Sequence, residues 1–402
     1  MTGLEPLPRT AWARIDLDAI AANLAAIRRA LPAGTRVDPV VKADAYGHGA
    51  VPVARTLAAA GADGLCVATF DEALELRAAG LRLPILVLFP IPPEHAPVAA
   101  RRGIEVSAGD PELLARTLDA VAADRAGRRG GRRLRIHLEI ETGLGRGGVL
   151  PADAAGALAR IRSAPGAAVA GVWSHLATPE DPAVAGRQAT RFRETGALLS
   201  DARIAVGRRH LASSGGLMAA TVPLHDAVRV GLAVYGLLPE GFPVAAGREG
   251  AAAALRPAMS LHARPVRVIE LPTGSGVGYD ATFVTDRPSR IATLPIGYGD
   301  GWTRAYSNRA AALVRGSRVP LVGNVAMDAV MADVTDLPGP PVTVDDEFVL
   351  LGEQGAERIV AADLARARGS NSWEVVTTIS RRVSRLYVAG GRPVATRTLA
   401  RG

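Results

Sequence analysis

The sequence predicts an α/β protein in which an eight-stranded parallel (β/α)8 barrel, residues 11–240, precedes a mainly β C-terminal domain, residues 241–395. Between residues 37 and 235, short apolar runs alternate with helical patterns, which is typical of successive β-α units. After residues 237–239, strand patterns dominate and helical periodicity is sparse. Residues 1–10 are expected to pack with the second domain. An open doubly wound sheet is the alternative for the first domain.

Eight apolar runs account for the barrel, since a closed (β/α)8 barrel needs eight parallel strands. Two helix starts are marked locally: Thr69 and Glu72 have the spacing of a capping box, and Asp110-Pro111 offers an N-cap followed by a first-turn proline. The predicted strands end near Lys42, Ala68, Phe89, Val106, Ile140, His175, Ser213 and Arg229.

A glycine- and alanine-rich connector, residues 240–254, leads into the second domain. This domain is expected to be a β layer with one helix. The strand patterns cover residues 260–271, 290–294, 311–319 and 347–351, and the helical pattern covers residues 361–368.

The 402 residues carry a formal charge of +8, but 39 acidic residues are mixed with the 47 basic ones. The densest basic stretch, residues 128–135, is short and glycine-rich, which favours a solvated loop over a nucleic-acid-binding face. Cys66 is the only cysteine, which excludes a disulfide framework and a cysteine-ligated zinc site. No apolar run is long enough to span a bilayer, and the first ten residues lack the apolar segment of a signal peptide. We therefore expect a cytoplasmic protein with no metal and with neither nucleic-acid nor membrane partners.

Lys42 is the only lysine in the chain. It follows the apolar pair Val40-Val41 and precedes a turn marked by Gly47 and Gly49. Arginine keeps its proton near neutral pH and so cannot act as a base, whereas an amine with a lowered pKa can act as a base and as a nucleophile. This pattern predicts a reactive amine at the carboxyl end of a barrel strand, where such folds keep their chemistry.

Residues 40–50 resemble the cofactor-lysine motif of the alanine racemases, a family that uses pyridoxal 5′-phosphate. One short motif is weak support, but further matches in the same order along the chain are specific. They cover residues 141–146, 173–178, 229–236, 277–279, 297–301 and 326–328. The resemblance implies the barrel, the C-terminal β domain and a head-to-tail homodimer with shared active sites.

The resemblance assigns catalysis to two bases. Lys42 would hold the cofactor as an imine and move a proton at one face of the substrate α-carbon. Tyr279, contributed by the partner subunit, would act at the opposite face with His175 as its neighbour. A free phenol has a pKa of about 10, so nearby cationic or hydrogen-bonding groups must favour the phenolate.

The remaining contacts are also implied by the resemblance. Arg229 would face the ring nitrogen of the cofactor; because guanidinium keeps its proton, the ring becomes a weaker electron sink, which suppresses transamination. His210 and His175 would belong to a hydrogen-bond chain through Arg229. The phosphate contacts would be Tyr46, Ser214, Gly231 and Leu232, and the substrate contacts would be Arg146, Met327, Tyr298 and Asp328. Asp300 is expected to cap a turn.

Three positions depart from the family pattern. Glu139 stands where many members have a lysine that is carbamylated, and its carboxylate is expected to position Arg146 without modification. Asn324 stands where an arginine often precedes the Met-Asp pair, and Arg381 stands where some members have a phosphate-facing tyrosine. The last two substitutions leave the substrate range open, including serine or larger amino acids.

The expected function is the pyridoxal-phosphate-dependent interconversion of L- and D-alanine, which supplies D-alanine for peptidoglycan in this family. A broad-specificity racemase of the same fold is the nearest alternative. A decarboxylase is disfavoured by Arg229, because decarboxylases on such barrels place an acidic group at the ring nitrogen. A non-catalytic pyridoxal-phosphate carrier is a further alternative, but such carriers typically lack a large β domain.

Overall fold

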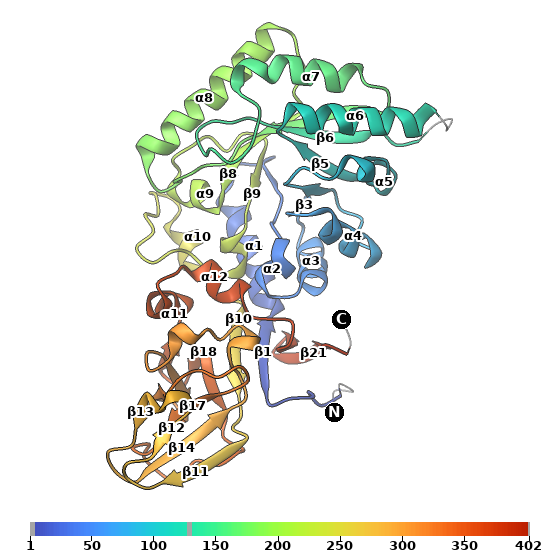
Figure 1. Cartoon of the computed structure of the whole chain (residues 1–402). Helices are drawn as coiled ribbons and strands as arrows, with labels where there is room; N and C mark the ends of the chain where they lie inside the picture. The colour runs from blue at the N-terminus through green and yellow to red at the C-terminus, as the bar shows by residue number, and fades with distance from the viewer. Residues whose placement is uncertain (1–4, 127–130, 401–402) are drawn as a thin grey trace.

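The computed structural model describes residues 5–126 and 131–400. It has two parts: a barrel of alternating strands and helices, and an elongated β domain formed mainly by the C-terminal third of the chain (Figure 1). Among the residues described, no helix combines the length and the apolar character needed to cross a membrane.

Eight strands form one parallel sheet in the order β2-β9-β8-β7-β6-β5-β4-β3. They are β2 (Arg36–Val37), β3 (Leu65–Val67), β4 (Ile85–Val87), β5 (Ile104–Ala108), β6 (Leu134–Glu139), β7 (Ala167–Trp173), β8 (Arg208–Ser213) and β9 (Ala227–Arg229). The two ends of this order meet after β2, where Val40 forms a parallel bridge with Cys66 of β3. Val41 N donates to Cys66 O at 2.8 Å, and Cys66 N donates to Pro39 O at 2.8 Å. The predicted eight-stranded parallel barrel is confirmed.

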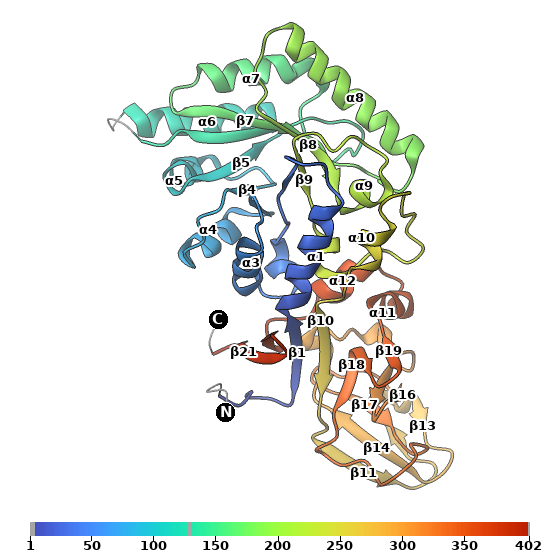
Figure 2. The same ribbon diagram turned by 180° about the vertical axis from the view of Figure 1, so that it is seen from behind.

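Helices surround this sheet (Figures 1 and 2). Both predicted helix starts are confirmed, since the Thr69–Glu72 capping box opens α4 and Asp110 accepts a hydrogen bond from Leu113 N at 2.8 Å at the start of α6. The α-helices of this part are α1 (Leu17–Arg29), α2 (Lys42–Tyr46), α3 (Ala50–Ala59), α4 (Phe70–Ala78), α5 (Ala96–Arg102), α6 (Pro111–Ala126), α7 (Ala154–Ser163), α8 (Pro182–Asp201), α9 (Ser214–Ala219) and α10 (Glu249–Ala253). Its 3-10 helices are η1 (Pro93–His95), η2 (Pro151–Asp153) and η3 (Leu232–Tyr235).

The β domain contains an eleven-stranded sheet in the order β11-β14-β17-β16-β15-β18-β10-β1-β20-β21, with β19 paired to β18, and a separate β12-β13 pair. The N-terminal strand β1 belongs to it, running antiparallel to β10 and parallel to β20. The strands are β1 (Ala11–Asp16), β10 (Met259–Ala263), β11 (Arg267–Leu271), β12 (Gly276–Val277), β13 (Phe283–Val284), β14 (Ser289–Leu294), β15 (Ala311–Val314), β16 (Ser317–Val322), β17 (Val330–Asp333), β18 (Phe348–Gln354), β19 (Glu357–Ile359), β20 (Ser384–Ala389) and β21 (Arg392–Arg397). The helices are η4 (Tyr279–Ala281), η5 (Tyr298–Asp300), η6 (Arg304–Tyr306), α11 (Ala361–Arg368) and α12 (Ser372–Thr377).

The sequence patterns of the second domain predicted where strands lie more accurately than how many strands there are. Residues 260–271 form two strands, β10 and β11, rather than one run, and residues 311–319 fold back at Arg315-Gly316, which have φ values of 52° and 74°. The helical pattern at residues 361–368 coincides with α11. Part of the basic stretch at residues 128–135, namely residues 128–130, lies outside the described residues.

The chain enters the barrel through the β1–α1 junction. Asp16 caps α1 by accepting from Ala19 N at 2.9 Å. Asn23 of α1 is fully buried; its Nδ2 donates to Val234 O at 3.0 Å and to Arg256 O at 2.9 Å, and its Oδ1 accepts from Arg256 N at 2.8 Å. One buried amide therefore ties α1 to the segments on both sides of the connector, because it satisfies backbone groups of each.

Gly236 at this junction should not tolerate a side chain. Its φ is 76°, and an added Cβ would lie 1.8 Å from Arg256 O. We expect Gly236→Ala to lower the free energy of unfolding by at least about 2 kcal/mol, because backbone strain and a backbone clash act together. Denaturant unfolding measures this change. Gly250→Ala in α10 is the matched control, since nothing lies within 4 Å of its added Cβ; equal stability of the two variants would contradict the prediction.

Candidate active site

Most of the predicted site residues lie at the carboxyl end of the barrel strands. Lys42 follows β2, His175 follows β7, Ser214 follows β8 and Arg229 ends β9. Arg146 lies in the loop after β6. Parallel strands direct their carboxyl ends to one edge of the barrel, so residues distant in sequence share one site.

Lys42 begins a turn of unusual backbone geometry. The next four residues, Ala43, Asp44, Ala45 and Tyr46, have φ values of 52°, 56°, 54° and 53°, which form one left-handed helical turn. This conformation costs roughly 1–2 kcal/mol per non-glycine residue. The turn is held by side chains: Glu72 accepts from Ala43 N at 2.6 Å, and His48 Nδ1 donates to the carbonyls of Ala45 and Tyr46, at 3.0 Å each.

Arg229 is 3% exposed, and its guanidinium stacks on Trp173 with 4.7 Å from Cζ to the ring centre. Its Nη1 lies 2.6 Å from His210 Nδ1, and its Nη2 donates to Ser174 O at 2.7 Å and approaches His175 Nδ1 at 3.4 Å. The expected chain of His175, Arg229 and His210 is therefore present in the geometry.

The series of hydrogen bonds continues from His210 to two residues that were not predicted from the sequence. His210 Nε2 lies 2.9 Å from His137 Nδ1, and His137 Nε2 lies 2.7 Å from Glu105 Oε2. Gly171 of β7 makes this path possible, because an added Cβ would lie 2.6 Å from His137 Nδ1. The hydrogen bonds thus connect β9, β8, β6 and β5 through the barrel interior.

The donor and acceptor of each hydrogen bond in the series from Arg229 to Glu105 follow from these two residues. Arg229 can only donate and an ionised Glu105 can only accept, so both histidines must be neutral with the proton on Nε2. The pKa values agree: burial and the charge of Arg229 hold the pKa of His210 well below its usual range, and burial lowers the pKa of His137. Burial alone would raise the pKa of Glu105, but the hydrogen bond from His137 and nearby arginines lower it to about 2.

The amine and the cations of the site act on one another. Burial, followed by the charge of Arg146, lowers the pKa of Lys42. Burial and the charges of Arg229, Arg146 and Lys42 lower the pKa of His175 to about 3, so this imidazole is neutral. Burial lowers the pKa of Arg229 to about 10, which leaves it charged at neutral pH. The site therefore combines positive charge with an amine of lowered pKa. Such a site suits an anionic ligand that reacts with an amine.

The proposed phosphate contacts form a small cradle. Ser214 Oγ accepts from Gly231 N at 3.0 Å and from Ala233 N at 3.3 Å, so its own hydrogen remains to be donated. Burial raises the pKa of Tyr46 to about 12, so its hydroxyl is a donor. An added Cβ on Gly231 would lie 2.6 Å from this hydroxyl, and Leu232 begins η3 directly after it. The donors and the space left by Gly231 fit a phosphate group beside Lys42.

Glu139 and Arg146 face each other across 3.8 Å, from Oε1 to Nη2. Burial raises the pKa of Glu139, and Arg146 opposes that shift. Arg146 also lies over the Phe89 ring, with 5.4 Å from Cζ to the ring centre. The structure thus places the carboxyl group of Glu139 beside Arg146; that it positions Arg146 for a substrate stays a prediction.

The remaining predicted residues lie in the β domain. Tyr279 is 68% exposed and follows β12, which lies in the β domain away from the barrel (Figure 1). Tyr298 N donates to Ala326 O at 3.0 Å and Gly299 N to Met327 O at 2.9 Å, which brings the two loops together. One chain therefore gathers Tyr298, Met327 and Asp328 in one place without joining Tyr279 to Lys42.

Asn324 and Asp300 have structural partners. Asn324 is 8% exposed, and its Nδ2 donates to Tyr279 O at 3.0 Å and Asp280 Oδ2 at 3.1 Å, so it fixes the backbone of the Tyr279 turn. Asp300 is fully buried and accepts from Gly297 N at 3.1 Å, as expected of a turn cap, and it also binds Arg9.

Arg381 is the departure whose surroundings differ most from those of a phosphate ligand. Its guanidinium is 3.8 Å from Asp44 and 3.7 Å from Glu75, and its side chain is 61% exposed. Asp328, by comparison, accepts from Arg382 Nη2 at 2.6 Å. The cation at residue 381 thus faces carboxylates beside the Lys42 turn.

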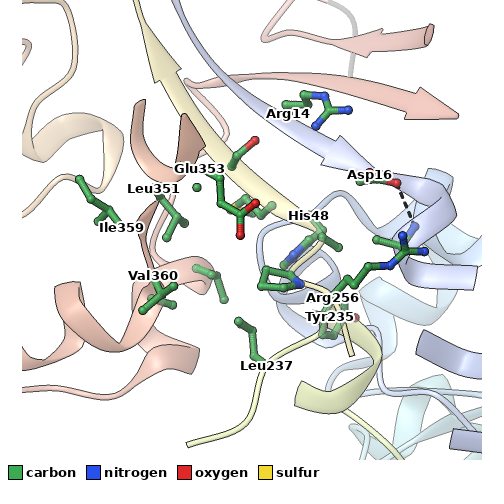
Figure 3. Close-up of a pocket in the computed structure, with 18 of the residues that line it drawn as sticks. Arg14, Asp16, His48, Tyr235, Leu237, Arg256, Leu351, Glu353, Ile359 and Val360 are labelled. Atoms are coloured by element: carbon green, nitrogen blue, oxygen red, sulfur yellow. Dashed lines mark hydrogen bonds between the residues drawn. The ribbon is translucent and has the colours of Figure 1, made fainter. Parts of the chain in front are cut away.

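A cavity of about 420 Å³ lies at the junction of the two parts, outside the predicted site. Figure 3 shows Arg14, Asp16 and Arg256 on one side of it and Leu351, Ile359 and Val360 on the other. None of the predicted site residues lines it. Its wall nevertheless includes His48, which supports the Lys42 turn from behind.

Sequence reasoning missed Glu105 and His137. A signal was present, because a glutamate inside the apolar run of β5 and a histidine two residues before Glu139 on β6 are both buried polar residues in barrel strands. It also missed Asp44, Arg385 and Arg397, whose contacts join residues more than 330 positions apart and leave no local pattern.

Comparisons with known proteins define the class. The family model for the alanine racemase N-terminal domain matches residues 15–239, and the model for the alanine racemase C-terminal domain matches residues 258–387. The alanine racemase of Symbiobacterium thermophilum is 41% identical over 384 residues, covering 94% of this chain and 97% of that protein. That of Thermobifida fusca is 41% identical over 389 residues, covering 95% and 99%.

Solved structures agree. The alanine racemase of Bacillus anthracis with bound L-Ala-P has a TM-score of 0.88 and 33% identity, covering 98% of this chain and 99% of that one. The enzyme from a D-cycloserine-producing Streptomyces lavendulae has a TM-score of 0.84 and 37% identity, covering 96% and 98%. The sequence relatives and the solved structures thus define the class as an amino-acid isomerase built on a barrel and a β domain. The chain belongs to the alanine racemase family.

The Glu105 end of the buried chain can be tested through stability. We expect Glu105→Gln to lower the free energy of unfolding at pH 7 by about 3 kcal/mol, because it removes one partner of a buried charged network. The folded pKa of about 2 lies below the ordinary 4.5, so this contribution is present above pH 4.5 and is lost as pH falls toward 2. The difference from the parent should therefore shrink over that range.

Denaturant unfolding at several pH values measures it. Glu112→Gln, at an exposed site on α6, is the control and should stay within about 0.5 kcal/mol of the parent. A Glu105→Gln variant that matches this control at pH 7 would contradict the assigned chain.

Proposed function

We propose that this protein interconverts L- and D-alanine with pyridoxal 5′-phosphate, using Lys42 and the Tyr279 of a second copy as the two bases. The observation that carries the proposal is the position of the buried Arg229, at the same barrel edge as the only lysine of the chain. Its Nη1 donates to His210 Nδ1 at 2.6 Å. A racemase needs both a removable proton at Lys42 and a cation that keeps its proton.

When bound, pyridoxal phosphate supplies an aldehyde that links to amines and a ring that withdraws electrons from the substrate α-carbon. Tyr46 and Ser214 would donate hydrogen bonds to its phosphate. Arg229, which keeps its proton, would donate to the ring nitrogen and leave it unprotonated, which would limit electron withdrawal by the ring. Lys42, whose pKa is lowered by burial, exchanges a proton at one face of that carbon.

The second base comes from a second copy of the chain. The Tyr279 side chain is exposed on the β domain, and Asn324 donates to its backbone carbonyl, so the phenol projects from a turn that Asn324 holds. His175, neutral and next to Arg229, is the neighbour proposed for it. Two copies related by two-fold symmetry then form two equal sites, each with Lys42 from one chain and Tyr279 from the other.

The substrate carboxylate pairs with Arg146, with the backbone around Met327 and the side chains of Tyr298 and Asp328 supplied by the second copy. We further propose that the product D-alanine serves peptidoglycan synthesis and that the reaction takes place in the cytoplasm. The neutral Asn324 leaves room for a broader substrate range, which a comparison of kcat/KM for L-alanine, L-serine and a basic amino acid decides.

A complementation experiment tests the shared site. Lys42→Ala and Tyr279→Phe should each abolish racemisation of L-alanine by more than about a thousandfold, since each removes one base. Mixing the two variants and allowing the subunits to exchange should restore about a quarter of the parental activity, because half the dimers then hold one intact site. The measurement is D-alanine formation with saturating cofactor.

Two further results bear on this assignment. Borohydride reduction of the parent followed by peptide mapping should place the cofactor on the peptide that contains Lys42. An unchanged rate in Tyr279→Phe, or no recovery on mixing two folded variants, would contradict the two-base assignment; a preference for serine over alanine would favour the broad-specificity alternative.

Glu139→Gln tests the anion beside Arg146. Because the 3.8 Å pair would lose its charge, Arg146 should be held less firmly, and KM for alanine should rise about tenfold in both directions with a smaller change in kcat. Steady-state kinetics measures both constants. Equal kinetics for Glu139→Gln and the parent in both directions would show that Glu139 does not position Arg146.

A further inference from the structure

The left-handed Lys42 turn is held from the β domain as well as from the barrel. Asp44, the second residue of the turn after Lys42, accepts from Arg397 Nη1 at 2.7 Å and from Arg397 Nη2 at 2.6 Å. Both side chains are largely buried, with 12% and 15% exposed. Arg397 is the last residue of β21, so the C-terminal hairpin reaches the amine-bearing turn of the barrel.

The same carboxylate fixes a third segment. Asp44 Oδ1 accepts from Ala50 N at 2.8 Å, at the start of α3. Burial alone would raise the pKa of Asp44, but hydrogen bonds from Arg397 and its charge lower it, which keeps the carboxylate ionised. One ion pair thus connects the turn, α3 and β21, and a bidentate, charge-assisted geometry makes such a connection stiff.

A second arginine of the hairpin supports the same region. Arg385 of β20 is fully buried, and its Nε and Nη2 donate to Gly47 O at 3.1 and 2.9 Å, directly after the turn. It also donates to Val383 O and Ile379 O at 2.6 Å each. Arg385 therefore links the residues around α12 to the end of the turn, and its replacement would disturb folding in general.

We propose that Arg397, acting through Asp44, is a positioning residue that holds the Lys42 amine in its buried place. The four residues after Lys42 occupy a backbone region that is unfavourable for alanine, aspartate and tyrosine, so contacts outside the turn must stabilise it. The Asp44–Arg397 pair supplies such a contact from another domain. The significance of the pair for catalysis rests on the proposed function, but its effect on the amine does not.

The single lysine allows a test without cofactor. In the apoprotein, an amine-labelling reagent such as trinitrobenzenesulfonate can modify only Lys42 and the chain terminus, which peptide mapping separates. The pH dependence of Lys42 labelling gives the pKa of its amine. We expect Arg397→Met to raise that pKa toward the ordinary 10.5, by on the order of one pH unit, because a loosened turn exposes the amine to water.

Matched variants separate positioning from general destabilisation. Arg392→Met, on the same strand and exposed, should keep the parental labelling profile. Asp44→Asn retains an acceptor for Ala50 N but loses the charge, and it should shift the profile as Arg397→Met does. The double variant should shift it no further, since the pair acts as one unit.

A folded Arg397→Met protein with the parental Lys42 profile would overturn the proposal, and so would additive shifts in the double variant. If Arg397→Met does not fold, Asp44→Asn decides in the same way. These outcomes differ from failure of the proposed function, which would appear in the parent as the absence of a borohydride-fixed cofactor on Lys42. Once cofactor is added, the variants should also show a smaller fraction fixed to Lys42 than the parent.

Discussion

The buried charge of Arg229 is the constraint on which the barrel interior depends. A guanidinium that is 3% exposed needs acceptors for its N–H groups, and it finds them on neighbouring strands: His210 on β8 and Ser174 after β7. The series of hydrogen bonds that starts at Arg229 ends two histidines away, at the carboxylate of Glu105 on β5. Because Arg229 donates at one end and Glu105 accepts at the other, both histidines stay neutral and Arg229 keeps its proton. The tautomers of both histidines therefore depend on the order of the strands that carry them. Gly171 on β7 leaves the space that His137 needs, because a side chain at this position would clash with the His137 ring.

The fold could be predicted from the sequence because its signals are local. Apolar runs, the Thr69–Glu72 capping box and the Asp110-Pro111 start each lie within a few residues, and α11 was expected at its observed bounds. The left-handed geometry of residues 43–46 could not be predicted in the same way, since Ala, Asp and Tyr do not favour it and the glycines that mark a turn, Gly47 and Gly49, come only after these residues. Besides the nearby His48, it is stabilised by Glu72, Arg385 and Arg397, and these distant contacts have no signature in the sequence near Lys42.

The contacts of three arginines show why arginine, and not lysine, occupies their positions. Arg385 fills a buried site by donating to several carbonyls, Arg397 forms a bidentate pair with Asp44, and Arg229 lies over the Trp173 ring. Each role uses the planar, multiply donating guanidinium, which an ammonium cannot reproduce. Lys42 has the opposite requirement in the proposed reaction, because there its amine must lose a proton. In this proposal, arginines provide the positive charge that stays fixed, and the one lysine provides the proton that is exchanged.

The β domain acts in two places. Through Arg385 and Arg397 it holds the Lys42 turn of its own chain, and in another place it exposes Tyr279 on a turn whose backbone Asn324 holds. In the proposed dimer, each β domain then fixes one base within its chain and delivers the other base to its partner. Any tilt of the domain would move the two bases of different sites together. Strand β1 opposes such a tilt, because it pairs with β10 and β20 of the β domain and leads directly into α1 of the barrel. Asn324 is consistent with this role: a neutral amide satisfies Tyr279 O and Asp280 in an 8% exposed position, where an arginine would need a further anion.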